Sequence, residues 1–263
     1  IFMNIKKKVL VFYPPSKLYQ RGEDRSQGNV EDSSATTMRA PNDLGYASAT
    51  LRDKNYEVKL KDYQSENLKF SDLKTDFETF KPDVIFVSIT NATIYDDLSI
   101  IDELLGGNTK TTVIIKGALF FNPDDAMLKL LPLNNIDYLV GGESDFMLAE
   151  LIETHFEKQE NLKNIRGISF KKNGEWIKTD FSTWENDLDS LVFPDRSEIK
   201  NKLYVRPDTG EAQATIVTSR GCPSKCIFCL TPTISGTKLR LRSPENIYEE
   251  IVNCYEKHNI RNF

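Results

Sequence analysis

The chain has 263 residues, of which 39% are hydrophobic and 28% are charged, and its formal net charge is −5. This length suits one large domain or two ordinary ones, and the composition is that of a globular chain rather than a disordered one. The negative balance gives no general attraction to nucleic acid or to an anionic membrane, and no apolar run is long enough to span a bilayer.

The chain opens with lysines and a short apolar run that ends at Tyr13-Pro14-Pro15. A secretory signal peptide needs a cleavage site of small residues after its apolar run, and none follows here. We therefore interpret the run as a buried strand and expect a cytoplasmic protein. Thiols stay reduced in that compartment, which disfavours a disulfide.

Short apolar runs alternate with helical patterns through the first half of the chain. The runs typical of strands are 8–13, 56–62, 83–89, 111–116 and 138–140. Helical spacing is present at 44–54, 71–80, 96–105, 124–131 and 146–156. This alternation predicts an α/β fold with a flavodoxin-like or Rossmann-like, doubly wound, mostly parallel sheet over residues 1–158. Ligands of such sheets bind beyond the carboxyl ends of the strands.

Three further segments complete the expected organisation. Residues 167–180 predict a β-hairpin whose two-residue turn is Asn173-Gly174, and hairpin and linker together occupy 159–212. A second unit is expected at 213–263: a strand at 214–218, a cysteine loop, and a helix that starts at Ser243-Pro244. The polar stretch at 21–39 is interpreted as a long surface loop or lid.

Several isolated residues receive structural interpretations. Arg220 and Lys225 flank the cysteine loop and are interpreted as solvated charges, and Asp62 is expected to cap a helix. Trp176 and Trp184 are interpreted as packing residues of the hairpin and the linker.

Three of the four cysteines stand together with the spacing Cys222-x3-Cys226-x2-Cys229. Zinc sites usually need a second ligand pair, and the remaining candidates are weak: Cys254 lies within a helical pattern, and the chain has only two histidines. A [4Fe–4S] cluster normally takes four thiolates, so three would leave one iron open to a substrate or cofactor. An open coordination position is typical of a catalytic site.

The stretch CPSKCIFC at 222–229 resembles the signature loop of the radical S-adenosylmethionine (SAM) enzymes, including the aromatic Phe228 before the last cysteine. The resemblance implies a [4Fe–4S] cluster on Cys222, Cys226 and Cys229, with SAM on the open iron and Phe228 as a SAM contact. It further implies an electron donor such as flavodoxin or ferredoxin. The expected chemistry is cleavage of SAM to methionine and a 5′-deoxyadenosyl radical.

The order of an α/β domain, the linker DLDSLVFPDR, TSRGCP and LRSPENIYEEI is similar to radical SAM proteins with an N-terminal cobalamin-binding domain. That resemblance implies corrin contacts from the strand-end loops at Ser88, Thr90, Gly117, Gly141, Gly142 and Glu143. Turn geometry explains the glycines equally well. The Asp-x-His-x-x-Gly loop is absent, and no histidine precedes His155. We therefore expect no lower axial histidine from a strand-end loop.

The resulting expectation is a radical SAM enzyme of cobalamin-linked methylation or rearrangement, acting on an unassigned substrate. One alternative is a methylthiotransferase; those relatives carry three further cysteines in the N-terminal domain, and none precedes Cys222 here. The other alternative is a non-catalytic cobalamin- or metal-binding module. A full (β/α) barrel needs about 250 residues, so residues 213–263 are expected to be the truncated start of the catalytic barrel, inactive by itself.

Overall fold

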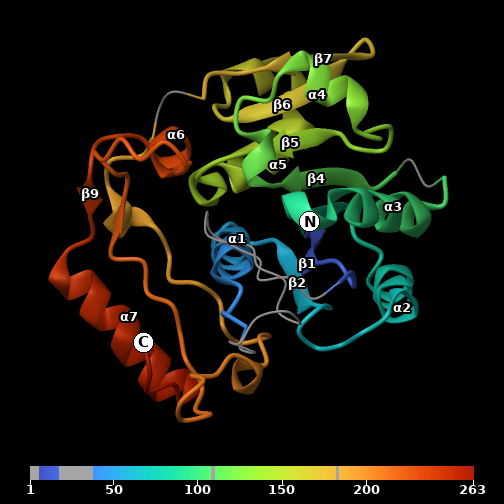
Figure 1. The fold of residues 1–263 in the computed structure, drawn as a ribbon. Coiled ribbons are helices and arrows are strands. Elements are labelled where there is room, and N and C mark those ends of the chain that lie inside the picture. The colour runs from blue at the N-terminus through green and yellow to red at the C-terminus, as the bar shows by residue number, and fades with distance from the viewer. Residues whose placement is uncertain (1–5, 18–37, 108–109, 182–183) are drawn as a thin grey trace, which may run out of the picture.

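The computed structural model describes residues 6–17, 38–107, 110–181 and 184–263. The predicted polar loop lies almost entirely outside these residues. The described chain forms a sheet with helices on both faces, and a smaller C-terminal unit lies beside it (Figure 1).

The main sheet has seven strands in the order β2-β1-β3-β4-β5-β6-β7. Those from β2 to β5 are parallel: β1 (Lys8–Tyr13), β2 (Glu57–Asp62), β3 (Val84–Ser88), β4 (Thr112–Lys116) and β5 (Tyr138–Val140). β1, β3 and β4 are nearly continuous apolar runs, as expected of strands covered on both faces. The predicted doubly wound, mostly parallel α/β fold is confirmed.

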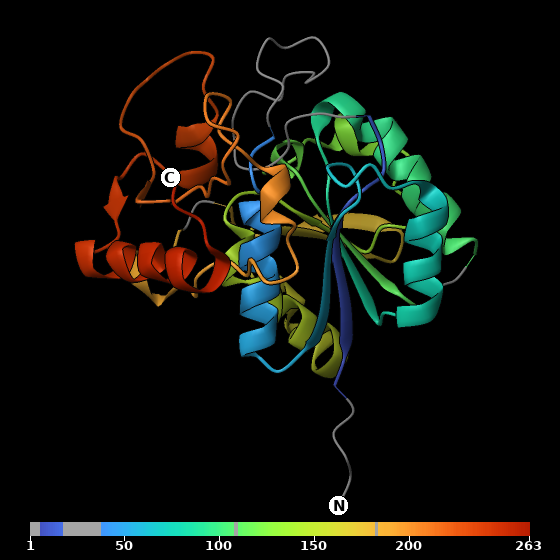
Figure 2. The ribbon, with the colours of Figure 1, turned by 90° about the horizontal axis from the view of Figure 1, so that it is seen from below.

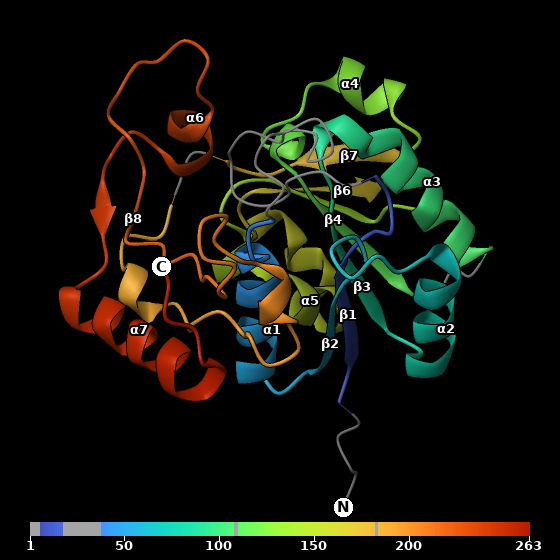
Figure 3. The ribbon, with the colours of Figure 1, turned by 60° about the horizontal axis from the view of Figure 1, so that its bottom comes forward.

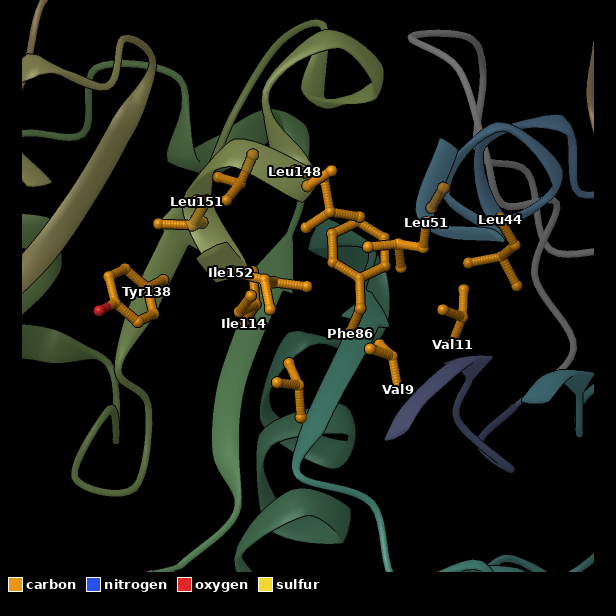
Figure 4. Packing of buried hydrophobic residues seen from close by; sticks show 14 of the residues in the cluster. Val9, Val11, Leu44, Leu51, Phe86, Ile114, Tyr138, Leu148, Leu151 and Ile152 are labelled. Atoms are coloured by element: carbon orange, nitrogen blue, oxygen red, sulfur yellow. The ribbon is translucent and has the colours of Figure 1, made fainter. Parts of the chain in front are cut away.

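Two helices cover one face of the sheet and three cover the other (Figure 2). The first face carries α1 (Asn42–Asp53) and α5 (Leu148–Glu157); the second carries α2 (Phe70–Phe80), α3 (Ile94–Leu105) and α4 (Asp125–Leu130). Side chains alternate along each strand. Val9 and Val11 therefore pack with the α1 and α5 core, where Leu51 and Ile152 meet Phe86 (Figure 4).

The predicted hairpin is confirmed as β6 (Ile168–Lys172) and β7 (Glu175–Lys178). Asn173 and Gly174 have φ of 53° and 84°, the left-handed conformations of the tight turn that joins two strands with the natural twist. β6 pairs antiparallel with β5, so the hairpin extends the same sheet. Trp176 packs against the core of the second face, as expected of a packing residue.

Short 3₁₀ turns follow several of these elements. They are η1 (Asn91–Thr93), η2 (Ala118–Phe120), η3 (Ser144–Phe146), η4 (Gln159–Asn164), η5 (Leu188–Ser190) and η6 (Asn201–Leu203).

Several hydrogen bonds and ion pairs join the linker to the sheet domain. The Asp195 amide donates to the Gly45 carbonyl at 2.9 Å, and the Ser48 hydroxyl donates to the Asp195 carboxylate at 2.8 Å. The buried Tyr204 hydroxyl donates to Asp62 at 2.7 Å. Asp62 also accepts from the Ser65 amide at 2.9 Å. The prediction of a helix cap at Asp62 was wrong, because its carboxylate closes the turn after β2 and holds the linker.

The C-terminal unit contains β8 (Ser219–Arg220), α6 (Thr231–Ser235), β9 (Arg240–Leu241) and α7 (Pro244–His258). The predicted start of α7 is confirmed, because the Ser243 hydroxyl accepts from the Asn246 amide at 3.2 Å. Trp184 is a packing residue, as expected, and its indole N–H donates to the Ile234 carbonyl at 2.6 Å.

The strand predicted at 214–218 was wrong. Its neighbour Gln213 makes one parallel bridge to Asn262, and no ladder forms before β8. Side chains take several of the free carbonyls instead. Asn42 donates to the Thr215 carbonyl at 2.9 Å, and Arg242 donates to the Val217 carbonyl at 2.9 Å.

None of the described helices is both long enough and apolar enough to cross a membrane.

Candidate functional site

A cleft of about 870 Å³ lies between the two parts of the molecule. One wall is the carboxyl edge of the parallel sheet, and the other is the segment from Thr215 to Cys222 with the loop from Phe228 to Thr231. Figure 3 shows the C-terminal unit beside α1, with the cysteine-bearing stretch between β8 and α6. The cleft thus occupies the edge at which parallel α/β sheets bind their ligands.

The strand-end residues singled out from the sequence separate into two groups. Ser88, Gly117, Gly142 and Glu143 line the cleft. Thr90 and Gly141 lie outside its described lining. The Thr90 amide donates to the buried Asp97 carboxylate at 3.4 Å.

Gly141 has a clear packing role. A Cβ at this position would lie 2.5 Å from both the Cα and the amide nitrogen of Phe121. Real Cβ atoms do not approach backbone so closely, so the close approach of the two chain segments requires glycine here. Gly117 differs, because the nearest atoms to its would-be Cβ are at 3.4 Å, which is ordinary contact.

Glu143 makes a two-pronged ion pair across the cleft edge. Its carboxylate accepts from Nη1 and Nη2 of Arg240 at 2.8 and 2.5 Å. Both side chains are below one-tenth exposed, which makes this a desolvated, geometrically specific contact. Glu143 therefore lines the cleft and also binds the C-terminal unit through Arg240.

Asp145 makes the second ion pair of this seam. Its carboxylate accepts from Nη2 of Arg220 at 2.5 Å, and the Arg220 guanidinium lies over the rings of Tyr46 and Phe146. Burial raises the pKa of Asp145, but the charges of Arg220 and Lys116 outweigh it and hold this pKa below its usual range. The prediction that Arg220 is a solvated charge was wrong. Lys225 is exposed, as expected.

A further acidic residue in the cleft wall was missed at the sequence level. Asp43, in the first turn of α1, accepts from the hydroxyls of Tyr13 and, at 2.8 Å, of Ser88. Its side chain is buried although it borders the cleft. The available signal was an acidic residue in the first turn of a helix, facing the carboxyl ends of two neighbouring strands.

Two buried arginines fix the backbone that leads into the cysteine loop. Arg196 and Arg242 bind opposite oxygens of Glu250 at 2.7 and 2.5 Å. Arg196 also donates to the Thr215 carbonyl at 3.3 Å, and the Arg242 amide donates to the Thr218 carbonyl at 3.0 Å. The segment is held in an extended form by side chains of the linker and of the region around α7.

The three loop cysteines form no disulfide within the described residues, and their exposure differs. Cys222 and Cys229 line the cleft, whereas Cys226 is exposed and lies outside that lining. Phe228 lines the cleft and is 87% exposed. The Cys222 amide donates to the Gly236 carbonyl at 3.0 Å, and the Cys229 amide donates to the Cys226 carbonyl at 3.2 Å.

The donor chemistry of this loop fits a thiolate-bound iron–sulfur cluster, but the placement of the sulfur atoms does not. Within the described ranges, no three His, Cys, Asp or Glu side chains are grouped so as to hold a metal ion. The assignment of Cys222, Cys226 and Cys229 as cluster ligands stays a prediction.

Cys254 and His155 have structural partners. Cys254 packs fully buried against Ala214 and Ile260, and burial raises the pKa of its thiol. The ring nitrogens of His155 lie 2.9 Å from the Thr112 hydroxyl and 2.7 Å from the Tyr138 hydroxyl. Cys254 therefore serves as a small buried hydrophobic residue in the packing of α7.

No protein-family model matches the chain. Among curated proteins, an uncharacterised methyltransferase of Pyrococcus horikoshii is 27% identical over 226 residues, which is 86% of this chain and 48% of the relative. The hopanoid C-3 methylase of Methylococcus capsulatus is 25% identical over 217 residues, 80% of this chain and 39% of the relative. The anaerobic magnesium-protoporphyrin IX monomethyl ester cyclase of Synechocystis is 30% identical over 130 residues, 49% of this chain and 25% of the relative.

Two solved structures share the fold. One is the radical S-adenosylmethionine methyltransferase TsrM of Kitasatospora setae with cobalamin and [4Fe-4S] cluster bound: its TM-score is 0.66 at 18% identity, over 97% of this chain and 48% of that one. The resemblance to radical SAM proteins with an N-terminal cobalamin-binding domain, predicted from the sequence, is confirmed. The other is OxsB, a cobalamin-dependent S-adenosylmethionine radical enzyme, with a TM-score of 0.69 at 19% identity, over 98% of this chain and 33% of that one.

The chain spans about half the length, or less, of these relatives. The activity and substrate of a whole radical SAM protein are therefore matters for proposal.

Proposed function

We propose that this chain is the cobalamin-binding and cluster-binding part of a radical SAM methyltransferase. The observation that supports it best is the cleft, because one wall is the ligand-binding edge of the sheet and the other carries Cys222 and Cys229. When bound, cobalamin would supply methyl transfer, and the [4Fe–4S] cluster with SAM would supply radical chemistry. The substrate is unassigned, and an electron-donor protein such as flavodoxin or ferredoxin is proposed as a partner.

Different residues of the cleft would contact the corrin, SAM and the cluster. Gly117 and Gly142 line the cleft at the strand ends, where we place the large planar corrin ligand. Ser88 has its hydroxyl oriented by Asp43, and Phe228 presents an exposed ring beside the cysteines, where we place SAM. Cys222, Cys226 and Cys229 would hold the cluster after a rearrangement that brings the three sulfur atoms together.

We propose that the chain is divided into three parts. Residues 1–158 form the cobalamin-binding-like domain, 159–212 the hairpin and linker, and 213–263 the first part of the catalytic domain. Reduced thiols in the loop suit a cytoplasmic protein. This location is part of the proposal.

The test is anaerobic reconstitution of the full-length protein with iron, sulfide and hydroxocobalamin, followed by absorbance and EPR spectroscopy. We expect an oxygen-sensitive [4Fe–4S] signal that SAM perturbs, and stoichiometric cobalamin. Cys226→Ala should abolish the cluster signal, whereas the matched variant Cys254→Ala, which removes a buried thiol outside the loop, should keep it. Stoichiometric zinc without iron would overturn the proposal.

One observation favours a second candidate, a cobalamin-binding module without radical chemistry. The three sulfur atoms do not converge in the described structure. This candidate predicts cobalamin in the cleft and no iron after the same reconstitution.

A further inference from the structure

Four charged side chains form a seam between the sheet domain and the cysteine loop. Glu143 and Asp145 follow β5, Arg220 ends β8 two residues before Cys222, and Arg240 begins β9. Every one of these side chains is one-tenth exposed or less. The seam is therefore a buried ion-pair cluster, in which each charge depends on its partners.

The two arginines lie opposite one another. Arg220 pairs with Arg240 in the antiparallel register of β8 and β9, which places both side chains on the same face of a two-strand ribbon. Like charges in that position repel, and an isolated two-strand ribbon is marginally stable. The carboxylates of Glu143 and Asp145 compensate both positive charges, so this ribbon is favoured only when it is docked on the sheet domain.

The backbone between the ribbon and Cys222 is closely packed, so the position of Arg220 fixes that of Cys222. Gly221, between Arg220 and Cys222, has φ of 84°, and a Cβ there would lie 2.1 Å from the Lys238 carbonyl oxygen. The following amide, that of Cys222, donates to the Gly236 carbonyl at 3.0 Å. The backbone on both sides of Gly221 is therefore held against the segment between α6 and β9.

We propose that Arg220 and Arg240 are positioning residues that lock Cys222 against the loop after β5, and that occupancy of the cleft is thereby coupled to the cysteine loop. This inference rests on the proposed function for the identity of the cleft ligand. The lock itself rests on the protein's own contacts, so the two parts are tested separately.

The lock is tested by the rate at which iodoacetamide alkylates each cysteine of the full-length, cofactor-free protein under anaerobic conditions, read by mass spectrometry. Arg220→Gln and Asp145→Asn should raise the Cys222 rate at least about fivefold, the lower range of ordinary coupling between sites. The Cys226 rate should stay unchanged because this thiol is already exposed. Cys254 should stay protected, which reports that the fold persists.

Two further variants separate positioning from general stability. Arg220→Lys should keep the Cys222 rate slow, because it retains a positive charge beside Asp145 and Glu143. Arg206→Gln is the matched control: it breaks an arginine–aspartate pair of the same 2.5 Å length, but an exposed one, and should leave Cys222 unaffected. An unchanged Cys222 rate in Arg220→Gln, or a parallel rise at Cys254, would overturn the lock.

The coupling is tested with hydroxocobalamin as the probe. Bound hydroxocobalamin, followed by its visible absorbance, should slow Cys222 alkylation in the wild-type protein and fail to do so in Arg220→Gln. Equal protection in both proteins overturns the coupling and leaves the lock standing. If the wild-type protein does not bind hydroxocobalamin, the cobalamin part of the proposed function fails together with the coupling, and the cofactor-free rates still decide the lock.

Discussion

Gly45 lies so close to Pro194 that a Cβ at position 45 would stand 3.0 Å from the proline Cβ. The same Cβ would stand 3.1 Å from the Asp195 carbonyl oxygen, on the backbone that the Gly45 carbonyl already binds. The middle of α1 is therefore shaped to receive the linker.

This contact predicts an unusual effect of Gly45→Ala. In an exposed helix interior, alanine is favoured over glycine by about 1 kcal/mol. Here the overpacking should reverse the sign and cost about 1–3 kcal/mol of unfolding free energy, measured by urea denaturation. The double variant with Pro194→Ala removes the nearest side-chain clash and should recover part of the loss. A Gly45→Ala protein that is more stable than wild type would contradict the docking described here.

The buried Arg196–Glu250–Arg242 triad predicts a large stability effect. Glu250→Gln leaves two buried guanidinium groups without a compensating charge, and breaking such a contact typically costs about 3–5 kcal/mol. We expect this loss by urea denaturation, with hydrogen exchange rising first at residues 214–218. The exposed Arg206→Gln substitution should cause no measurable loss. An equal change in unfolding free energy for the two substitutions would show that the buried triad stabilises the fold no more than an exposed ion pair.

The two strand-end glycines should respond differently to alanine. Gly141→Ala places a methyl group against the Phe121 backbone and should cost about 1–3 kcal/mol of unfolding free energy or more. Gly117 has φ of −175°, extended backbone that alanine adopts freely, and meets only ordinary contacts. Gly117→Ala should keep full stability while weakening hydroxocobalamin binding in an absorbance titration. A stability loss in Gly117→Ala together with weaker hydroxocobalamin binding in a stable Gly141→Ala would contradict both roles.

Both histidines predict a loss of stability on mild acidification. Burial lowers the pKa of His155 and that of His258, so the unfolded chain takes up protons first as the pH falls. Their contribution is complete above the ordinary histidine pKa of about 6.5 and is lost as the pH falls through the folded pKa values. Burial raises the pKa of Asp137, which acts in the opposite direction. The histidine contribution is therefore isolated by comparing the pH dependence of unfolding free energy in wild type and in a histidine variant.

His155→Gln should flatten the dependence of unfolding free energy on pH between 7.5 and 5, measured by urea denaturation. Exposed surface variants give the baseline slope. An unchanged slope in His155→Gln would mean that this ring titrates alike in the folded and unfolded chains.

The sequence predicted those elements whose causes are local. The apolar run of β3, the Asn173-Gly174 turn and the Ser243 cap each carry their signal within a few residues. The strand expected at 214–218 failed because its carbonyl partners are remote: Asn42 lies 173 residues from Thr215. Local pattern does not reveal such partners.

The candidate site also combines features with a local sequence signal and features that depend on remote partners. The strand-end loops and the cysteine motif were visible as spacing, and both border the cleft. The burial of Arg220 was not visible, because its partner Asp145 is 75 residues away and belongs to another part of the fold. A charge beside a loop is solvated on average, and only the packed tertiary structure identifies the exceptions.

The outermost strands of the main sheet, β2 and β7, have one further consequence. Each lies at an edge of the described sheet, and a sheet edge is a template for pairing with another molecule. In β2 two groups of this edge are already bonded: the Leu60 amide donates to Glu198 at 2.8 Å, and the Val58 carbonyl accepts from Arg52 at 2.8 Å. Lysines stand on both, with Lys59 and Lys61 in β2 and Lys178 in β7, and each is in an ion pair with an acidic neighbour. Charged edges of this kind discourage strand-to-strand self-association, which disfavours aggregation of the domain along its sheet.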